Sequence, residues 1–239
     1  MGDLTTISPD EIVFWSWGAF ELNATIAFTW ALMAVMVIGS YLLTRRLHTD
    51  ATVPRWQALL EIVVETIRDQ IREITRQPAG PYIPFIGTLF LFIALANTLT
   101  IIPGYMPPTA SLSTTAGLAI CVFVAVPTYG MIAEGPKAYF RHYISPTPLM
   151  LPFNIMGELS RTLALAVRLF GNIMSGMKVV AIIVAIAPFI FPIFMQLLGL
   201  LTGLVQAYIF AVLAAVYIAS GIQVQKKTQN DGLEEHTDE

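Results

Sequence analysis

Three charged residues lie inside an otherwise apolar stretch between Pro148 and Gly176, namely Glu158, Arg161 and Arg168. An arginine at the centre of a membrane helix costs at least ~2.5–3.5 kcal/mol, so it normally has an anionic partner or a water-filled cavity. A guanidinium group cannot lose its charge by deprotonation. Glu158 and Arg161 are three residues apart and can pair on one helix face. Arg168 is about 15 Å along the helix axis from Glu158, which leaves it without a partner on its own helix.

The other long uncharged segments offer no partner for Arg168 either. Residues 22–44, 77–133 and 179–225 contain no acidic residue. One alternative is that Arg168 extends to the lipid headgroups, but apolar and small residues continue for two turns beyond it. We therefore expect that the anion facing Arg168 belongs to water, to lipid or to another polypeptide.

Polar and small residues accompany this arginine. Asn172 lies four residues further on, on the same helix face, and Gln206 lies midway along the last apolar segment, where a buried amide needs a partner. Small residues recur at helical spacing in both segments, which is typical of closely packed membrane helices, and packing alone would explain them. They are Gly199, Gly203, Ala207 and Ala211 in the last segment, and Gly157, Ala164, Gly171 and Ser175 in the one before. Together they predict a long two-helix hairpin.

The composition excludes a water-soluble protein. The chain has 239 residues, of which 56% are hydrophobic and 12% charged, whereas soluble domains carry roughly 25% charged residues. A net charge of −3 gives no reason to expect nucleic acid as a partner. Cys121 is the single cysteine, and all three histidines lie in polar surroundings. We therefore expect no disulfide, metal site or cofactor.

The spacing of charges predicts an all-α membrane protein with about five transmembrane helices in a single membrane domain, residues 1–239. An amphipathic helix along the cytoplasmic face is predicted over residues 54–77, where apolar residues recur every three or four positions. It serves as a surface anchor or as a docking site for a partner. The predicted segments are an outer N-terminal segment at 1–21, spans at 22–44, 80–103, 112–133, 148–177 and 190–224, and a flexible cytoplasmic tail at 228–239.

The basic residues predict the orientation. With the N-terminus outside and the C-terminus in the cytoplasm, ten of the thirteen basic residues fall on the cytoplasmic side. Only Lys178 then lies near the outer side. We expect a multi-pass protein of the bacterial inner membrane.

A family resemblance is carried by three stretches of the sequence. Arg168-Leu169-Phe170-Gly171-Asn172, the preceding residues 158–161 and the following residues 206–210 resemble subunit a of F-type ATP synthases. The resemblance extends from about Pro81 to Gly221 and includes Asn97 and residues 108–110.

The resemblance implies an ion-translocating stator with two aqueous half-channels, facing a rotating ring of c subunits that each carry a membrane carboxylate. The hairpin of the last two helices would face this ring. Arg168 would be the essential arginine, and Gln206 would face it. Further implied partners are the peripheral-stalk b subunits, other ATP synthase subunits and lipid, with no covalent chemistry on this chain.

The sequence departs from some relatives where they carry titratable residues. Met177 and Gly199 replace such residues, and Ser111 follows residues 108–110, where an aspartate is common. Neutral polar residues remain to line an outer path for H⁺ or Na⁺, including Asn97, Ser111 and Thr114. Residues at 111 and 113 are equally well explained as helix caps. The alternatives are a Na⁺-translocating ATPase that works mainly as a pump, and a stand-alone secondary transporter.

Overall fold

The structure, a computed structural model, describes most of the chain as helix. The described residues are 13–17, 20–45, 55–75, 80–102, 104–135, 150–186 and 191–235. Within these residues the α-helices are α1 (Ala24–Thr44), α2 (Arg55–Thr75), α3 (Ile83–Thr98), α4 (Leu112–Glu134), α6 (Met150–Ile186) and α7 (Phe191–Glu235). Two 3-10 turns, η2 (Leu99–Ile101) and η3 (Pro108–Ala110), connect α3 to α4, and two strands, β1 (Val13–Trp17) and β2 (Phe20–Asn23), precede α1.

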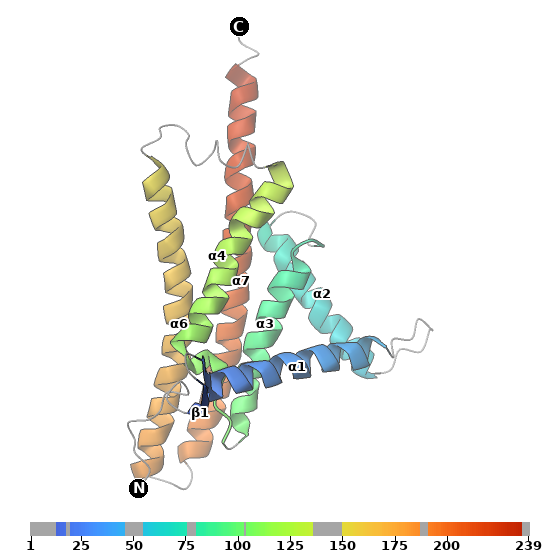
Figure 1. Cartoon of the computed structure of the whole chain (residues 1–239). Coiled ribbons are helices and arrows are strands. Elements are labelled where there is room, and N and C mark those ends of the chain that lie inside the picture. Colours follow the sequence, from blue (N-terminus) through green and yellow to red (C-terminus); the bar gives the residue numbers. More distant parts are fainter. Residues whose placement is uncertain are drawn as a thin grey trace.

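Four helices form the body of the molecule. Figure 1 shows α3, α4, α6 and α7 side by side, with α7 running opposite to both α3 and α6. Within the described residues, five helices are long and apolar enough to cross a membrane, namely α1, α3, α4, α6 and α7. This confirms the predicted all-α membrane fold with five spans, and α6 and α7 form the predicted long hairpin.

Local sequence explains where these helices begin and end. Pro84 stands in the first turn of α3, where its missing N–H costs nothing. Gly135 ends α4 with a φ of 90°, a conformation that other residues adopt at a cost. Pro127 is inside α4 and is tolerated there, as prolines are in membrane helices whose neighbours satisfy the freed backbone groups.

The core lies where α3, α4, α6 and α7 meet. Ile93 of α3, Leu169 of α6 and Phe210 of α7 are fully buried there, and Ala207 lets α7 approach its neighbours closely. A second cluster joins α2 to the body through Ile71, which packs with residues of α3, α4 and α7. α2 therefore forms as the predicted amphipathic helix and covers one side of the bundle.

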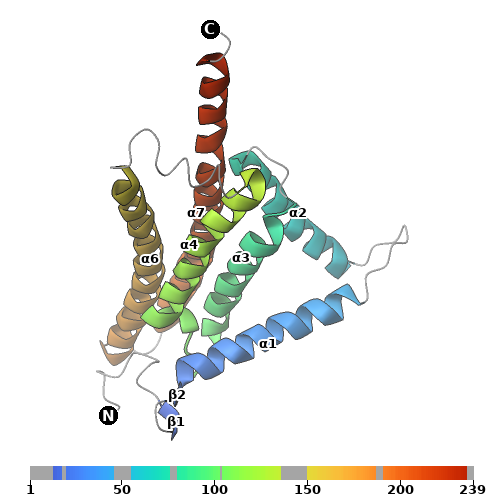
Figure 2. The ribbon, with the colours of Figure 1, turned by 45° about the horizontal axis from the view of Figure 1, so that its top comes forward.

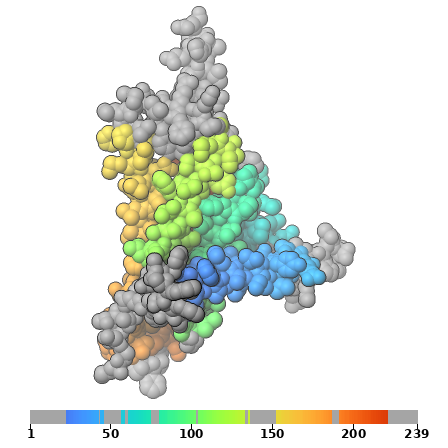
Figure 3. All heavy atoms as spheres, in the orientation of Figure 1, coloured from blue at the N-terminus to red at the C-terminus, as the bar shows by residue number. Residues whose placement is uncertain are grey.

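α1 is placed differently from the other apolar helices. Figures 1 and 2 show that it runs across the direction of α3, α4, α6 and α7, and Figure 3 shows its C-terminal part extending beyond the body of the bundle. Ala24 and Leu32 are buried near its start, whereas Val37 and Tyr41 are exposed. Contacts with α3 and η3 thus hold the first part of this helix.

Three boundaries differ from the sequence prediction. The predicted outer N-terminal segment at 1–21 overlaps the strands β1 and β2, which pair antiparallel with Trp17 opposite Phe20. α6 continues to Ile186 rather than to 177, because Lys178 is followed by an apolar run before Pro188. α7 continues to Glu235, so the tail predicted to be flexible from 228 is helical over most of its length. An existing helix adds each further turn without a new nucleation cost.

We predict that Tyr105→Phe stabilises the protein. The Tyr105 ring meets Phe28 edge to face with centroids 5.2 Å apart, but its buried hydroxyl has no hydrogen bond within the described residues. Removing the hydroxyl should raise the free energy of unfolding by about 1 kcal/mol, seen as a higher midpoint of thermal unfolding in detergent.

The pH dependence gives a second measurement of the same change. Burial raises the pKa of Tyr105 from 10.0 to about 12. Between these values the unfolded side chain ionises while the native one stays protonated, so this residue's contribution to stability falls as the pH rises. The advantage of Tyr105→Phe should therefore grow with pH across this interval; a variant no more stable than the parent would contradict the prediction.

Candidate functional site

Arg168 lies on the outer face of α6, away from the core. Leu165, Leu169 and Ile173 on the same helix are buried and fix the rotation of α6 against its neighbours. That rotation leaves Arg168 exposed. Within the described part of the chain, no hydrogen bond or ion pair engages its guanidinium group. None of the described residues therefore neutralises Arg168.

Gln206 lies at the level of Arg168 on the neighbouring helix. Asn172 Nδ2 of α6 donates a long hydrogen bond of 3.5 Å to the carbonyl oxygen of Thr202 on α7. The two helices are antiparallel and rise ~1.5 Å per residue. Arg168 precedes Asn172 by four residues, and Gln206 follows Thr202 by four residues. Both steps lead in the same direction along the bundle, so Arg168 and Gln206 lie at the same height. The hydrogen bond therefore sets the register that brings the two residues level.

Gln206 is nearly buried, with 6% of its surface exposed. Its side chain makes no hydrogen bond to the residues that the structure describes. An amide among apolar helices gains free energy from a polar partner, so this side chain is available to bind water, an ion or a group from outside the chain.

A buried polar cluster connects the turn between α3 and α4 to α7. We call Asn97, Thr109, Ser111 and Thr115 the α3–α7 polar cluster; all four are buried. Asn97 Nδ2 donates to the carbonyl oxygen of Gly203 at 2.9 Å, and the Thr109 hydroxyl donates to Asn97 Oδ1 at 2.8 Å. Gly203 is three residues, or about 4.5 Å of helix rise, before Gln206. The cluster therefore leads from the turn at η3 to within one turn of the level of Arg168.

The remaining predicted polar residues lie at the start of α4. Ser111 and Ser113 share a hydrogen bond of 2.7 Å between their hydroxyls, and the Thr115 hydroxyl donates to the Ser111 carbonyl oxygen at 3.1 Å. Neither serine makes a side-chain cap at the N-terminus of α4. Thr114 is half-buried. The hydroxyls at this end of α4 thus extend the cluster toward the surface.

Arg161 and Glu158 occupy the part of α6 before Arg168. Arg161 is exposed, and its guanidinium carbon lies 5.9 Å from the centroid of the Tyr217 ring on α7, an arrangement in which a cation is attracted to the ring face. Glu158 is half-buried. Arg161 therefore has an aromatic partner on α7, whereas no described residue pairs with Arg168.

The predicted packing residues fall into two groups. Gly203 and Ala207 are buried, and a Cβ atom added at Gly203 would lie 3.0 Å from Cβ of Asn97. An added Cβ atom at Gly171 or Gly199 meets nothing within 4 Å. These two glycines therefore do not mediate close packing within the chain, which differs from the sequence prediction.

The cluster contains only neutral side chains. Amide and hydroxyl oxygens can line a hydrated path, and they leave the charge of Arg168 unopposed. Among the described residues, no group of three or more His, Cys, Asp or Glu side chains could hold a metal ion.

Two contacts are not predicted from the sequence. Thr109 lies in residues 108–110, which carry part of the family resemblance, but a threonine after proline in a turn has no periodic pattern that would indicate its partner. The hydroxyl of Tyr208, which donates to Gln70 Oε1 at 2.7 Å, joins residues that are far apart in the chain. A tyrosine in an apolar helix does indicate that its hydroxyl needs a partner, but it does not indicate which one.

We predict that Gly203→Ala disrupts the cluster, because the new methyl group would press against Asn97 and strain its hydrogen bond to residue 203. We expect a loss of ~1–3 kcal/mol in stability and weaker ion-coupled activity. Gly199→Ala, one turn earlier in open space, is the matched control and should be neutral or slightly stabilising. Equal effects of the two substitutions would contradict a close approach at 203.

Comparisons with known proteins give the family of this chain. A family model described as ATP synthase A chain matches residues 26–219. ATP synthase subunit a 2 of Acaryochloris marina is 57% identical over 231 residues, which cover 96% of this chain and 99% of the relative. ATP synthase subunit a of Albidiferax ferrireducens is 58% identical over 226 residues, 95% of this chain and 98% of the relative. The chain therefore belongs to the ATP synthase A chain family.

Proposed function

We propose that this chain is the ion-translocating stator of a rotary ATP synthase and that Arg168 is its coupling residue. The observation that carries the proposal is an exposed guanidinium group on an apolar helix, with no anion from the described residues to pair with. As a member of its family, the chain is an integral membrane subunit of an ATP synthase. An anion on another subunit would pair with Arg168 only while that subunit lies in front of α6.

The partner that fits Arg168 is a ring of c subunits, each with a carboxylate in the membrane. Small residues beside Arg168 support a close approach, because Ala164, Gly171 and Ser175 are all exposed on α6. Arg168 would draw the carboxylate into its ionised form, lowering its pKa and releasing its ion. Gln206, level with Arg168 and without a hydrogen bond to the described residues, would bind the carboxylate as it passes.

The α3–α7 polar cluster would form part of the half-channel that opens on the outer side. Its hydrogen bonds run from the turn at η3 to Gly203, near the level of Gln206. We place the N-terminus outside and α2 at the cytoplasmic face of a bacterial inner membrane, in agreement with the distribution of basic residues. The peripheral-stalk b subunits are the further partners of this arrangement. The names of the relatives favour neither alternative considered for the sequence, a dedicated sodium pump or a stand-alone transporter.

Arg168→Ala is the decisive test of this proposal. The complex should still assemble, because the side chain makes no contact that the bundle needs, but ion-coupled ATP synthesis in membrane vesicles should be abolished. Arg168→Lys should also fail substantially, since a lysine can lose its proton when desolvated. Lys178→Gln, which removes an exposed cation from the same helix, should retain coupling. Normal synthesis by an assembled Arg168→Ala complex would refute the assignment.

The position of the ring can be tested independently by photo-crosslinking. A photoreactive amino acid at Val167, which is 52% exposed beside Arg168, should form adducts with c subunits in the intact complex. Ile120 on α4 is similarly exposed, at 57%, and should give none. Adducts from residue 120 alone would place the ring against the wrong face.

A further inference from the structure

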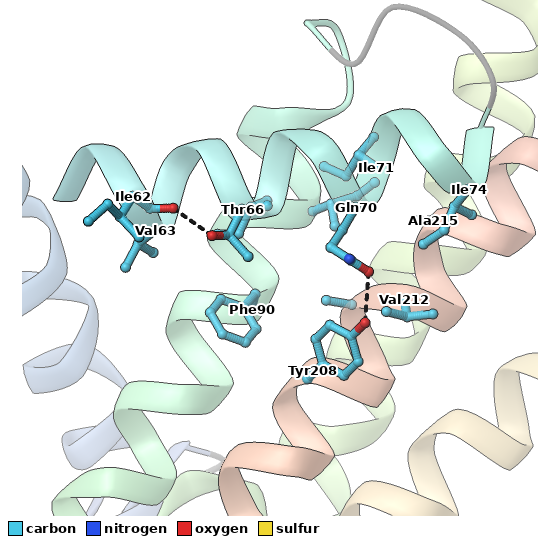
Figure 4. A pocket seen from close by; sticks show the side chains of 13 residues that line it. Ile62, Val63, Thr66, Gln70, Ile71, Ile74, Phe90, Tyr208, Val212 and Ala215 are labelled. Atoms are coloured by element: carbon cyan, nitrogen blue, oxygen red, sulfur yellow. Dashed lines mark hydrogen bonds between the residues drawn. The ribbon is translucent and has the colours of Figure 1, made fainter. Parts of the chain in front are cut away.

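An apolar cavity of about 220 Å³ lies between α2, α3 and α7. Figure 4 shows α2 along one side of the cavity, with side chains of α3 and α7 opposite. Branched aliphatic residues and two aromatic rings, those of Phe90 and Tyr208, form most of its wall. Its labelled apolar residues include Ile62, Val63, Ile74, Phe90, Val212 and Ala215. Neither Arg168 nor Gln206 nor any residue of the α3–α7 polar cluster lines this cavity, so it is distinct from the candidate site.

The polar side chains in the wall are engaged with one another or with the backbone. The Thr66 hydroxyl donates to the carbonyl oxygen of Ile62 at 2.7 Å, and the Tyr208 hydroxyl donates to Gln70 Oε1 at 2.7 Å. Water needs two to four polar partners in a cavity, and this wall does not present them. An engineered apolar cavity of roughly 150 Å³ stays dry and binds benzene. The larger space here therefore suits an apolar ligand.

The cavity is continuous with the lipid-facing surface of the protein. Ile62 and Val63 line it, yet they are 58% and 40% exposed, so they belong to its wall and to the outer surface at once. The opposite side of α2 carries exposed charges, among them Glu65, Arg68 and Arg72. A helix of this kind lies in the membrane interface with its apolar face ~5–10 Å below the headgroups. The opening is therefore at the depth where acyl chains begin.

The chemistry of the cavity disfavours a polypeptide backbone as its occupant, because its lining is almost entirely apolar. An extended segment would bring backbone N–H and C=O groups that need hydrogen-bond partners, and the wall offers none. A hydrocarbon chain needs no such partner and gains contacts along its whole length.

We propose that this cavity holds the end of a phospholipid acyl chain from the membrane leaflet in which α2 lies. The chain fills the space that the side chains of α2, α3 and α7 leave between them. It thereby holds α2 against the bundle, together with Ile71 and the Tyr208–Gln70 hydrogen bond. This site does not depend on the ion-coupling role of Arg168.

Lipid retention by the assembled complex tests the proposal. The complex is exchanged into detergent and its bound phospholipids are counted by native mass spectrometry. Val212→Phe projects a ring into the cavity, whereas Val216→Phe adds the same ring one turn later, at a 38% exposed position outside the wall. We expect a phospholipid that the parent and Val216→Phe retain and that Val212→Phe loses. Equal retention by all three proteins would overturn the proposal.

A second measurement needs no substitution, in case Val212→Phe does not assemble. The unmodified complex is reconstituted in phosphatidylcholine vesicles that contain a phospholipid with a diazirine near the end of one acyl chain. After illumination and detergent washing, lipid adducts should map to the wall, including Phe90 and Val212. Adducts spread evenly over exposed residues such as Val216, or adducts absent from the wall because a partner protein covers it, would each overturn the proposal.

Discussion

A fixed positive charge on an apolar helix is the constraint on which the rest of this structure depends. Arg168 cannot become neutral, and the described chain gives it no anion. The packing of the bundle keeps the guanidinium group exposed and away from the core. Buried leucines on either side of it hold α6 in one rotation, and Asn172 sets the height of α7 so that Gln206 is level with the charge. The neighbouring Arg161, in contrast, lies over an aromatic ring of its own chain.

The buried polar cluster positions α7 without competing for that charge. Helices in a membrane gain little from the hydrophobic effect on packing together, so close contact and hydrogen bonds must hold them. Asn97 provides both, because it fits against the bare backbone at Gly203 and binds its carbonyl oxygen. An acidic residue in this cluster could pair with Arg168, whereas an amide and hydroxyls cannot neutralise its charge.

The same limit on helix packing explains why α2 leaves space beneath it. Its apolar face meets α3 and α7 mainly through Ile71 and neighbouring side chains, and the contact is incomplete toward Ile62 and Val63. In water such a gap would be costly, but beside a bilayer it can be filled by hydrocarbon. Lipid then becomes part of the contact between the interfacial helix and the bundle that holds Arg168.

The sequence by itself determined the class of fold, the approximate position of each apolar helix and the presence of a charged arginine on one of them. These follow from helix length, charge spacing and apolar periodicity, which are local properties of the chain. The tertiary structure alone decided which residues meet. The levels of Arg168 and Gln206, the link from Thr109 through Asn97 to Gly203, and the crossing of α1 all depend on contacts between distant segments. No periodicity encodes these, because they are set by how side chains fit once the helices have come together.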